Sequence, residues 1–188
     1  MNEQLINLAL EAGAAKAEII SVDQIETSAE FREACRQNMC GVWGKCWMCP
    51  PDVGEIETLM AEIRQYKQAL WYQTIGELED SFDIEGMGEA KKKHIRMTYQ
   101  VEDLAKPLIG KHLHLSCGGC GLCERCSRVD NEPCRFPEKA MPSLEAYGVN
   151  VSKMAASAGM RYINGVNTVT YFGAVFFSLT ENGGDQNG

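Results

Sequence analysis

Five cysteines lie within eighteen residues in the second half of the chain. Four of them, Cys117, Cys120, Cys123 and Cys126, follow one another at three-residue intervals in CGGCGLCERC, and Cys134 follows in NEPCRFP. This spacing suits a cubane iron–sulfur cluster, because the backbone of a C-x2-C-x2-C segment curls around one compact object and turns each sulfur inward. The glycines between the cysteines allow such a curl, since glycine accepts positive φ. We therefore expect an iron–sulfur cluster here.

A second cysteine group lies about seventy residues upstream, between residues 35 and 51. Its spacing is C-x4-C-x5-C-x2-C, and two prolines follow the last cysteine in CGVWGKCWMCPP. A proline after a ligating cysteine removes a backbone donor and stiffens the turn. Trp43 and Trp47 suit either a shield for a cluster or an ordinary core. The candidate ligands of this group are Cys35, Cys40, Cys46 and Cys49.

The nine cysteines favour metal binding over disulfides. The first residues, MNEQLINLAL, lack the basic and apolar regions of a secretory signal, so we expect a cytoplasmic protein whose thiols stay reduced. An odd number of thiols also cannot be fully paired. Zinc is the alternative metal. Structural zinc usually takes two C-x2-C pairs separated by a longer loop, whereas only two residues separate Cys120 from Cys123.

The number of thiols fits two separate [4Fe-4S] clusters. Two cubanes with four thiolates each use eight cysteines, so one cysteine is left over, and the count does not say which. The two groups have no common spacing, and we therefore expect each to form its own site rather than two halves of a duplicated ferredoxin.

Hydrophobic periodicity predicts alternating helices and strands around these groups. Ser143 is expected to open a helix that Gly159 closes, and Asp52 with Glu55 has the spacing of a helix capping box. Residues 79–88 are expected to form a loop. Helices are predicted over residues 3–14, 27–35, 52–70, 89–109 and 143–158, and strands over residues 15–25, 69–78, 111–116 and 167–180.

This element order predicts an α/β or α+β fold: a small mixed sheet of about four strands with packed helices and cysteine loops at element ends. We expect one domain over residues 1–181. Its two cluster loops would span residues 35–51 and 117–137, and residues 182–188 would form a flexible tail.

Charge and hydropathy exclude two classes of partner. The net charge is −8, which argues against binding nucleic acid, because phosphate contacts need a basic patch. The one basic run, residues 91–96, is interpreted as a solvated helix face. No apolar run is long enough to span a membrane. His94, His112 and His114 are possible acid–base groups, but solvated surface histidines are the favoured interpretation.

The two motifs together resemble the DUF2284 family of predicted metal-binding proteins. The resemblance is carried by CGVWGKCWMCPP and by CGGCGLCERCSRVDNEPCRFPEKAMPSLEAYGVNV, and it covers most of the chain. It implies a metal or iron–sulfur protein of anaerobic prokaryotes. It also implies that Cys117 is the spare thiol, because the family pattern maps onto the other cysteines of its group. The ligands implied for the second group are Cys120, Cys123, Cys126 and Cys134.

In the first group the family pattern matches Cys40, Trp47 and Cys49. Cys35 and Cys46 are included as ligands; if one does not bind, the first cluster has three thiolates and an open iron.

Three functions compete on this basis. Electron transfer to a redox partner protein is favoured, because the chain has cluster motifs but no nucleotide-binding G-x-G-x-x-G or G-x-x-x-x-G-K-[ST] signature. The first alternative is a non-redox enzyme, lyase-like or desulfurase-like, that uses the open iron as a Lewis acid. The second is an interaction module stabilised by zinc or clusters. The sequence does not indicate the oligomeric state.

Overall fold

A four-stranded sheet forms the centre of the protein, which is described over residues 1–179 of a computed structural model. The strand order is β1-β2-β4-β3, and all three pairings are antiparallel. The expected α/β or α+β class with about four strands is confirmed, and within residues 1–179 the strands of this sheet pair only in antiparallel fashion, although a mixed sheet was expected. The strands are β1 (Lys16–Ser21), β2 (Gln68–Glu77), β3 (His112–Leu115) and β4 (Thr168–Phe177).

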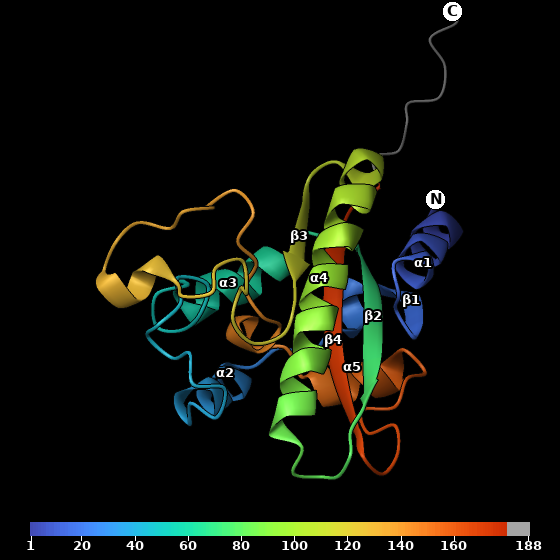
Figure 1. Cartoon of the computed structure of the whole chain (residues 1–188). Helices are drawn as coiled ribbons and strands as arrows, with labels where there is room; N and C mark the ends of the chain where they lie inside the picture. Colours follow the sequence, from blue (N-terminus) through green and yellow to red (C-terminus); the bar gives the residue numbers. More distant parts are fainter. Residues whose placement is uncertain (180–188) are drawn as a thin grey trace, which may run out of the picture.

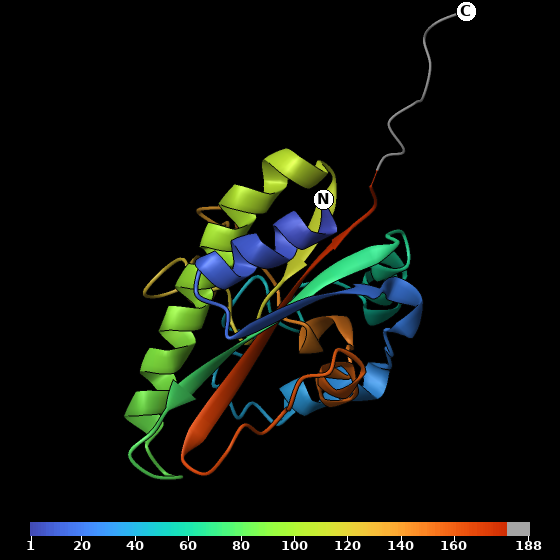
Figure 2. The same ribbon diagram turned by 90° about the vertical axis from the view of Figure 1, so that its right-hand side faces the viewer.

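Helices cover both faces of this sheet (Figures 1 and 2). Helices α1 and α4 pack on one face, and α3 and α5 pack on the other, where α2 also lies. Three short 3-10 turns, Val22–Gln24, Ser127–Asp130 and Glu145–Tyr147, complete the fold. The α-helices are α1 (Asn2–Glu11), α2 (Ala29–Arg36), α3 (Ile56–Ile63), α4 (Ile84–Ile109) and α5 (Val151–Ser157).

The central strands supply the core of both layers. In β2, Trp71 points to the α3/α5 side, while its neighbours Leu70 and Tyr72 point to the α1/α4 side. In β4, Phe176 and Phe177 divide in the same way. Successive side chains alternate across a strand, so a sheet covered on both faces needs apolar residues at consecutive positions. This explains why both strands contain continuous apolar stretches.

The two cysteine loops lie next to each other at one side of the sheet. Figure 1 shows the cyan chain after α2 and the yellow-to-orange chain after β3 extending together away from the strands. Contacts between the loops, described below, hold them there. The fold therefore brings together two segments that are about seventy residues apart in the sequence.

The structure corrects two predicted helix starts. The expected capping box does not form: α3 begins at Ile56, its N-cap Glu55 makes no side-chain cap, and Asp52 instead pairs with Arg128 at 2.8 Å. The predicted loop over residues 79–88 is partly helical, because the Asp83 side chain accepts a hydrogen bond from the Gly86 amide at 2.7 Å and starts α4 at Ile84.

The helix predicted over residues 143–158 is interrupted. A 3-10 turn spans Glu145–Tyr147, and α5 begins only at Val151. Gly148 separates the two with a φ of 70°, and a side chain there would meet the carbonyl oxygen of Ser28 at 2.6 Å. The close approach of the chain at Ser28 therefore requires glycine and breaks the helix.

Two further expectations concern the ends and the membrane. The boundary at residue 181 and the tail over residues 182–188 lie outside the described residues. Within residues 1–179, none of the helices combines the length and the apolar character that crossing a membrane requires.

Candidate metal centre

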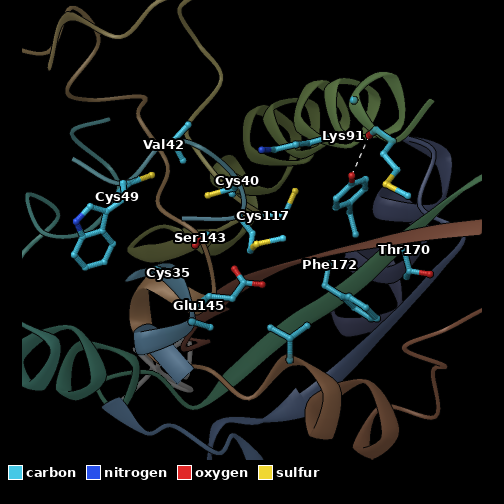
Figure 3. Close-up of a pocket in the computed structure, with 18 of the residues that line it drawn as sticks. Cys35, Cys40, Val42, Cys49, Lys91, Cys117, Ser143, Glu145, Thr170 and Phe172 are labelled. Atoms are coloured by element: carbon cyan, nitrogen blue, oxygen red, sulfur yellow. Dashed lines mark hydrogen bonds between the residues drawn. The ribbon is translucent and has the colours of Figure 1, made fainter. Parts of the chain in front are cut away.

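Four thiols from both loops line a large cavity, which we call cavity A. Its volume is about 560 Å³, and it lies between α2, α4 and the first half of β4. Figure 3 shows its cysteines with Lys91, Ser143 and Glu145 around the same space. The thiols of cavity A belong to Cys35, Cys40, Cys49 and Cys117.

The other five thiols line a much smaller space, cavity B, of about 30 Å³. Trp47, Met48 and Phe136 form part of its apolar wall. Cavity B contains one thiol more than a cubane cluster uses. Its cysteines are Cys46, Cys120, Cys123, Cys126 and Cys134.

This division differs from the expectation that each cysteine group forms its own site. Cys46 leaves the first group and joins the second, while Cys117, which the family resemblance implied to be spare, lies with the first group. Spacing along the chain carried no signal for this exchange. Cys46 and Cys49 are three residues apart in a turn that lies between the two cavities, so their thiols face different spaces.

Three contacts hold the loops against each other. The Trp47 indole Nε1 donates a hydrogen bond to the carbonyl oxygen of Glu132 at 2.9 Å. Arg128 forms its ion pair with Asp52 at 2.8 Å, and its guanidinium lies over the Trp47 ring at 5.1 Å from the centroid. A cation over a tryptophan face is attracted by the ring quadrupole. These contacts keep Cys46 next to the second group.

Strand β3 delivers Cys117 to cavity A. Ser116, which follows the strand, bridges in parallel to Ser143: its amide bonds to the carbonyl oxygen of Pro142, and its carbonyl accepts from the amide of Leu144, both at 2.9 Å. This pairing brings the chain around Glu145 next to Cys117. Gly118 then turns the chain with a φ of 61°, and a Cβ on it would lie 2.5 Å from Lys91 Nζ. The Lys91 side chain therefore packs directly on the cysteine loop.

Hydrogen bonds link the two cavities. The thiol of Cys49 hydrogen bonds to Cys46 and lowers the pKa of Cys46, with further help from the backbone of Cys120 and the thiol of Cys126. The same contact, together with burial, raises the pKa of Cys49. At cavity B, the Tyr99 hydroxyl lies 3.4 Å from Cys120 Sγ, a contact that lowers the pKa of Cys120 against the larger effect of burial.

The donor set fits a metal group that prefers sulfur ligands. All nine cysteines are free thiols. Burial raises the pKa of Cys35 to about 11 and that of Cys117 to about 12, so neither thiolate is stabilised by the protein alone. The positive charge of a bound metal supplies such stabilisation and deprotonates a coordinating thiol. Within the described part of the chain, no group of three or more His, Cys, Asp or Glu side chains could hold a single metal ion.

The three histidines are not solvated surface residues, as the sequence had led us to expect. His94 and His114 are buried, and His112 is half-buried. Nε2 of His112 and Nδ1 of His114 contact the Glu102 carboxylate, at 2.9 and 3.0 Å. Nδ1 of His112 also faces an acceptor, the carbonyl oxygen of Gly110 at 2.5 Å, so both ring nitrogens are placed to donate, an arrangement that favours the imidazolium form.

A buried polar network continues from this pair towards Cys117. His114 Nε2 lies 2.7 Å from the Tyr72 hydroxyl, which is 3.1 Å from the Thr98 hydroxyl, and Ser116 donates to Thr98 at 3.4 Å. Gly173 on β4 makes room for Tyr72, since a Cβ there would meet the Tyr72 hydroxyl. The network orders the end of β3.

Replacing Glu102 by glutamine should destabilise the protein by about 1–3 kcal/mol at pH 6, because a half-buried imidazolium loses its anion. Burial opposes ionisation of Glu102, but its hydrogen bonds to His112 and His114 lower its pKa below the ordinary 4.5. The pKa of His112 is raised above 6.5, chiefly by Glu102. Urea unfolding of both proteins at several pH values measures the difference.

The sign of each shift sets the pH window. Because the carboxyl pKa is lowered on folding, it stabilises the fold above pH 4.5, and this stabilisation is lost as the pH falls through the pKa of the folded state. Because the histidine pKa is raised on folding, it stabilises the fold below pH 6.5, and this stabilisation is lost as the pH rises through the pKa of the folded state. The difference in the free energy of unfolding between the wild type and Glu102→Gln should therefore be largest between pH 4.5 and pH 6.5. Glu89→Gln, in an exposed pair with Lys92, is the matched control; an equal effect of both changes would contradict the role of Glu102.

Comparison with known proteins agrees with the cysteine chemistry. Searches of the curated proteins and of the solved structures gave no significant match. A family model, described as DUF2284, predicted metal-binding protein, matches residues 18–177, which include both cysteine loops and all four strands except the first two residues of β1. The chain therefore belongs to the DUF2284 family of predicted metal-binding proteins.

Proposed function

We propose that this protein binds two [4Fe-4S] clusters and transfers electrons between them and a redox partner protein. Cavity A would hold one cluster through its four thiols, and cavity B would hold the other through four of its five. A bound cluster of this kind accepts and releases one electron at a potential that its surroundings set. Residues 1–181 would act as one iron–sulfur domain.

The observation that carries the proposal is the exchange of cysteines between the loops. Cys46 and Cys49 lie on one turn and face different cavities, and their thiols are close enough to shift each other's pKa. Two metal groups held by such neighbouring sulfurs would lie close together, as a relay requires. Each loop contributes thiols to both cavities, so the same pair of loops would hold both groups.

The surroundings of the thiols also suit redox groups. The Tyr99 hydroxyl donates a hydrogen bond to the carbonyl oxygen of Cys120 at 3.1 Å and lies 3.4 Å from Cys120 Sγ, so a polar group contacts a sulfur of cavity B. Hydrogen bonds to ligating sulfurs and burial are the means by which proteins set cluster potentials. Lys91, packed on the Cys117 loop, adds positive charge near cavity A, where it would raise the potential.

The partner is expected to be a protein with a basic contact surface. The chain carries a net charge of −8, and charge complementarity accelerates the encounter of transient partners. A cytoplasmic location fits a protein in which all nine cysteines are free thiols.

Anaerobic purification followed by iron and sulfide analysis and an EPR redox titration tests this function. We expect about eight irons and eight sulfides per chain. On reduction by dithionite, each cluster should take up one electron reversibly, and the fully reduced protein should show the broadened signals of two interacting spins. Clusters that do not change their redox state would contradict electron transfer, and a colourless, zinc-loaded protein would support the interaction module instead.

A further inference from the structure

The two cavities differ in size far more than two similar clusters require. Cavity A has a volume of about 560 Å³ and cavity B about 30 Å³, although both are lined by enough thiols for a cubane. A cubane core of four irons and four sulfides would fill only part of the volume of cavity A, so space is left there for another occupant. Its volume lies within the range of about 300–1,000 Å³ that is common for small-molecule sites.

The walls of cavity A are those of a small-molecule site. Trp43, Met87, Tyr171 and Phe172 contribute apolar and aromatic surface to the wall of the cavity. Ile84 in the same wall is 79% exposed, so the apolar surface continues to the mouth of the cavity. An apolar lining with a few convergent polar groups is typical of sites that bind small organic molecules.

Two side chains of opposite charge face each other across this cavity. Figure 3 shows Lys91 on α4 at one side of the cavity and Glu145 on its 3-10 turn at the other, with Cys117 between them. Lys91 Nζ packs against Gly118 of the cysteine loop. Glu145 is partly buried and makes no ion pair with any residue between 1 and 179. Burial raises the pKa of Glu145, and Lys91 across the cavity only partly opposes this effect, so a cationic ligand placed against the carboxylate would compensate the cost of burying its charge.

The charge of the proposed cluster strengthens this preference. Four thiolates around a [4Fe-4S] core of charge +2 leave a net charge of about −2. Lys91 offsets one unit and Glu145 adds one, so the loaded cavity stays anionic. Aromatic faces such as those of Trp43 and Tyr171 also attract cations. Cluster, carboxylate and aromatic rings thus select for the same kind of molecule.

We propose that cavity A is a binding site for a small organic ammonium ion with an apolar body. Its ammonium group pairs with Glu145, and its apolar body lies against Tyr171 and Phe172. Lys91 repels the ligand and keeps its affinity moderate. The proposal rests on the proposed function only for the charge of the cluster, since the cavity and Glu145 belong to the protein itself.

Calorimetry on the anaerobic, iron-loaded protein with phenethylamine as the probe tests the site. Phenethylamine should bind, while 3-phenylpropionate and 2-phenylethanol, which replace the ammonium by a carboxylate and a hydroxyl, should bind at least about tenfold more weakly. Glu145→Gln should weaken amine binding about tenfold, and Lys91→Met should strengthen it about threefold. The matched controls Glu89→Gln and Lys92→Met change exposed residues of α4 and should leave the affinity unchanged.

Opposite effects of the Glu145 and Lys91 variants separate a charge-selective site from damage to the fold. A misfolded variant weakens binding, so the gain in Lys91→Met cannot arise from damage. Tighter binding of 3-phenylpropionate, or no binding of phenethylamine, would overturn the proposal. Iron and sulfide analysis of the same samples reports on the clusters independently. If the iron-loaded protein does not bind phenethylamine, the ammonium site is refuted but the clusters are not. If the protein contains no iron, the clusters are refuted but the ammonium site is not.

Discussion

Replacing Cys117 by serine should remove about half of the iron and sulfide from the anaerobically purified protein, that is, about four irons of eight. The reason is the position of Cys117, which is buried at the end of β3 and lines cavity A with Cys35, Cys40 and Cys49. A serine hydroxyl is a poor ligand for iron and leaves the proposed cluster with three thiolates. Iron and sulfide analysis with EPR of the reduced variant measures the loss.

The result distinguishes two assignments of Cys117. The family resemblance implies that Cys117 is spare, and full iron content in Cys117→Ser would restore that assignment. The structure places Cys117 beside the first group, so we expect the EPR signal of a single, uncoupled cluster. Ser116→Ala is the matched control, because Ser116 pairs with Thr98 and lies one residue away without offering sulfur.

Serine replacements at the five cysteines of cavity B should give four variants that lose about half of the iron and one that keeps all of it. Five thiols exceed the four that a cubane takes. We expect Cys46→Ser to be among the losses. Cys46 is only 5% exposed, and its hydrogen bonds to Cys49 and Cys126 stabilise the thiolate that iron requires. Iron content, measured variant by variant, identifies the spare thiol.

The number of variants that keep all their iron decides how many thiolates hold the cluster in cavity B. If two or more variants keep all their iron, cavity B has a three-thiolate cluster, and the open-iron enzyme becomes the better account. If Cys46→Ser keeps all its iron, the first cysteine group supplies no ligand to the cluster in cavity B. Circular dichroism of each variant should match the wild type, because both faces of the sheet are covered by helices that do not depend on the cysteines of cavity B.

Loss of one cluster in each series should also remove the spin coupling expected for the fully reduced protein. The turn between Cys46 and Cys49 lies between the two cavities. Spin coupling needs one cluster on each side of this turn, so it disappears when either cluster is lost. A Cys117→Ser protein that kept a coupled signal would show that the second spin lies elsewhere. The relay and the ligand assignment are thereby tested by the same samples.

Local patterns in the sequence were sufficient for most of the secondary structure. Each predicted strand forms, since consecutive apolar residues such as Leu70, Trp71 and Tyr72 meet covered faces on both sides. Two of the errors arose from contacts with a remote part of the chain, whereas the helical start at Ile84 depends on the local cap by Asp83. Asp52 pairs with Arg128 instead of capping α3, and Gly148 breaks a helix because the chain at Ser28 lies against it. No local pattern reports such contacts.

The sequence by itself determined the chemistry of this protein: nine free thiols in two groups, an acidic surface and membership of a family of predicted metal-binding proteins. Only the tertiary structure decided which thiols share a cavity, because the exchange of Cys46 and Cys117 depends on contacts such as Trp47 with Glu132 across the loops. It also decided that Glu145 and Lys91 face one space. Spacing along the chain constrains a cysteine only relative to its near neighbours, whereas a cavity is closed by whichever segments the sheet and helices bring together.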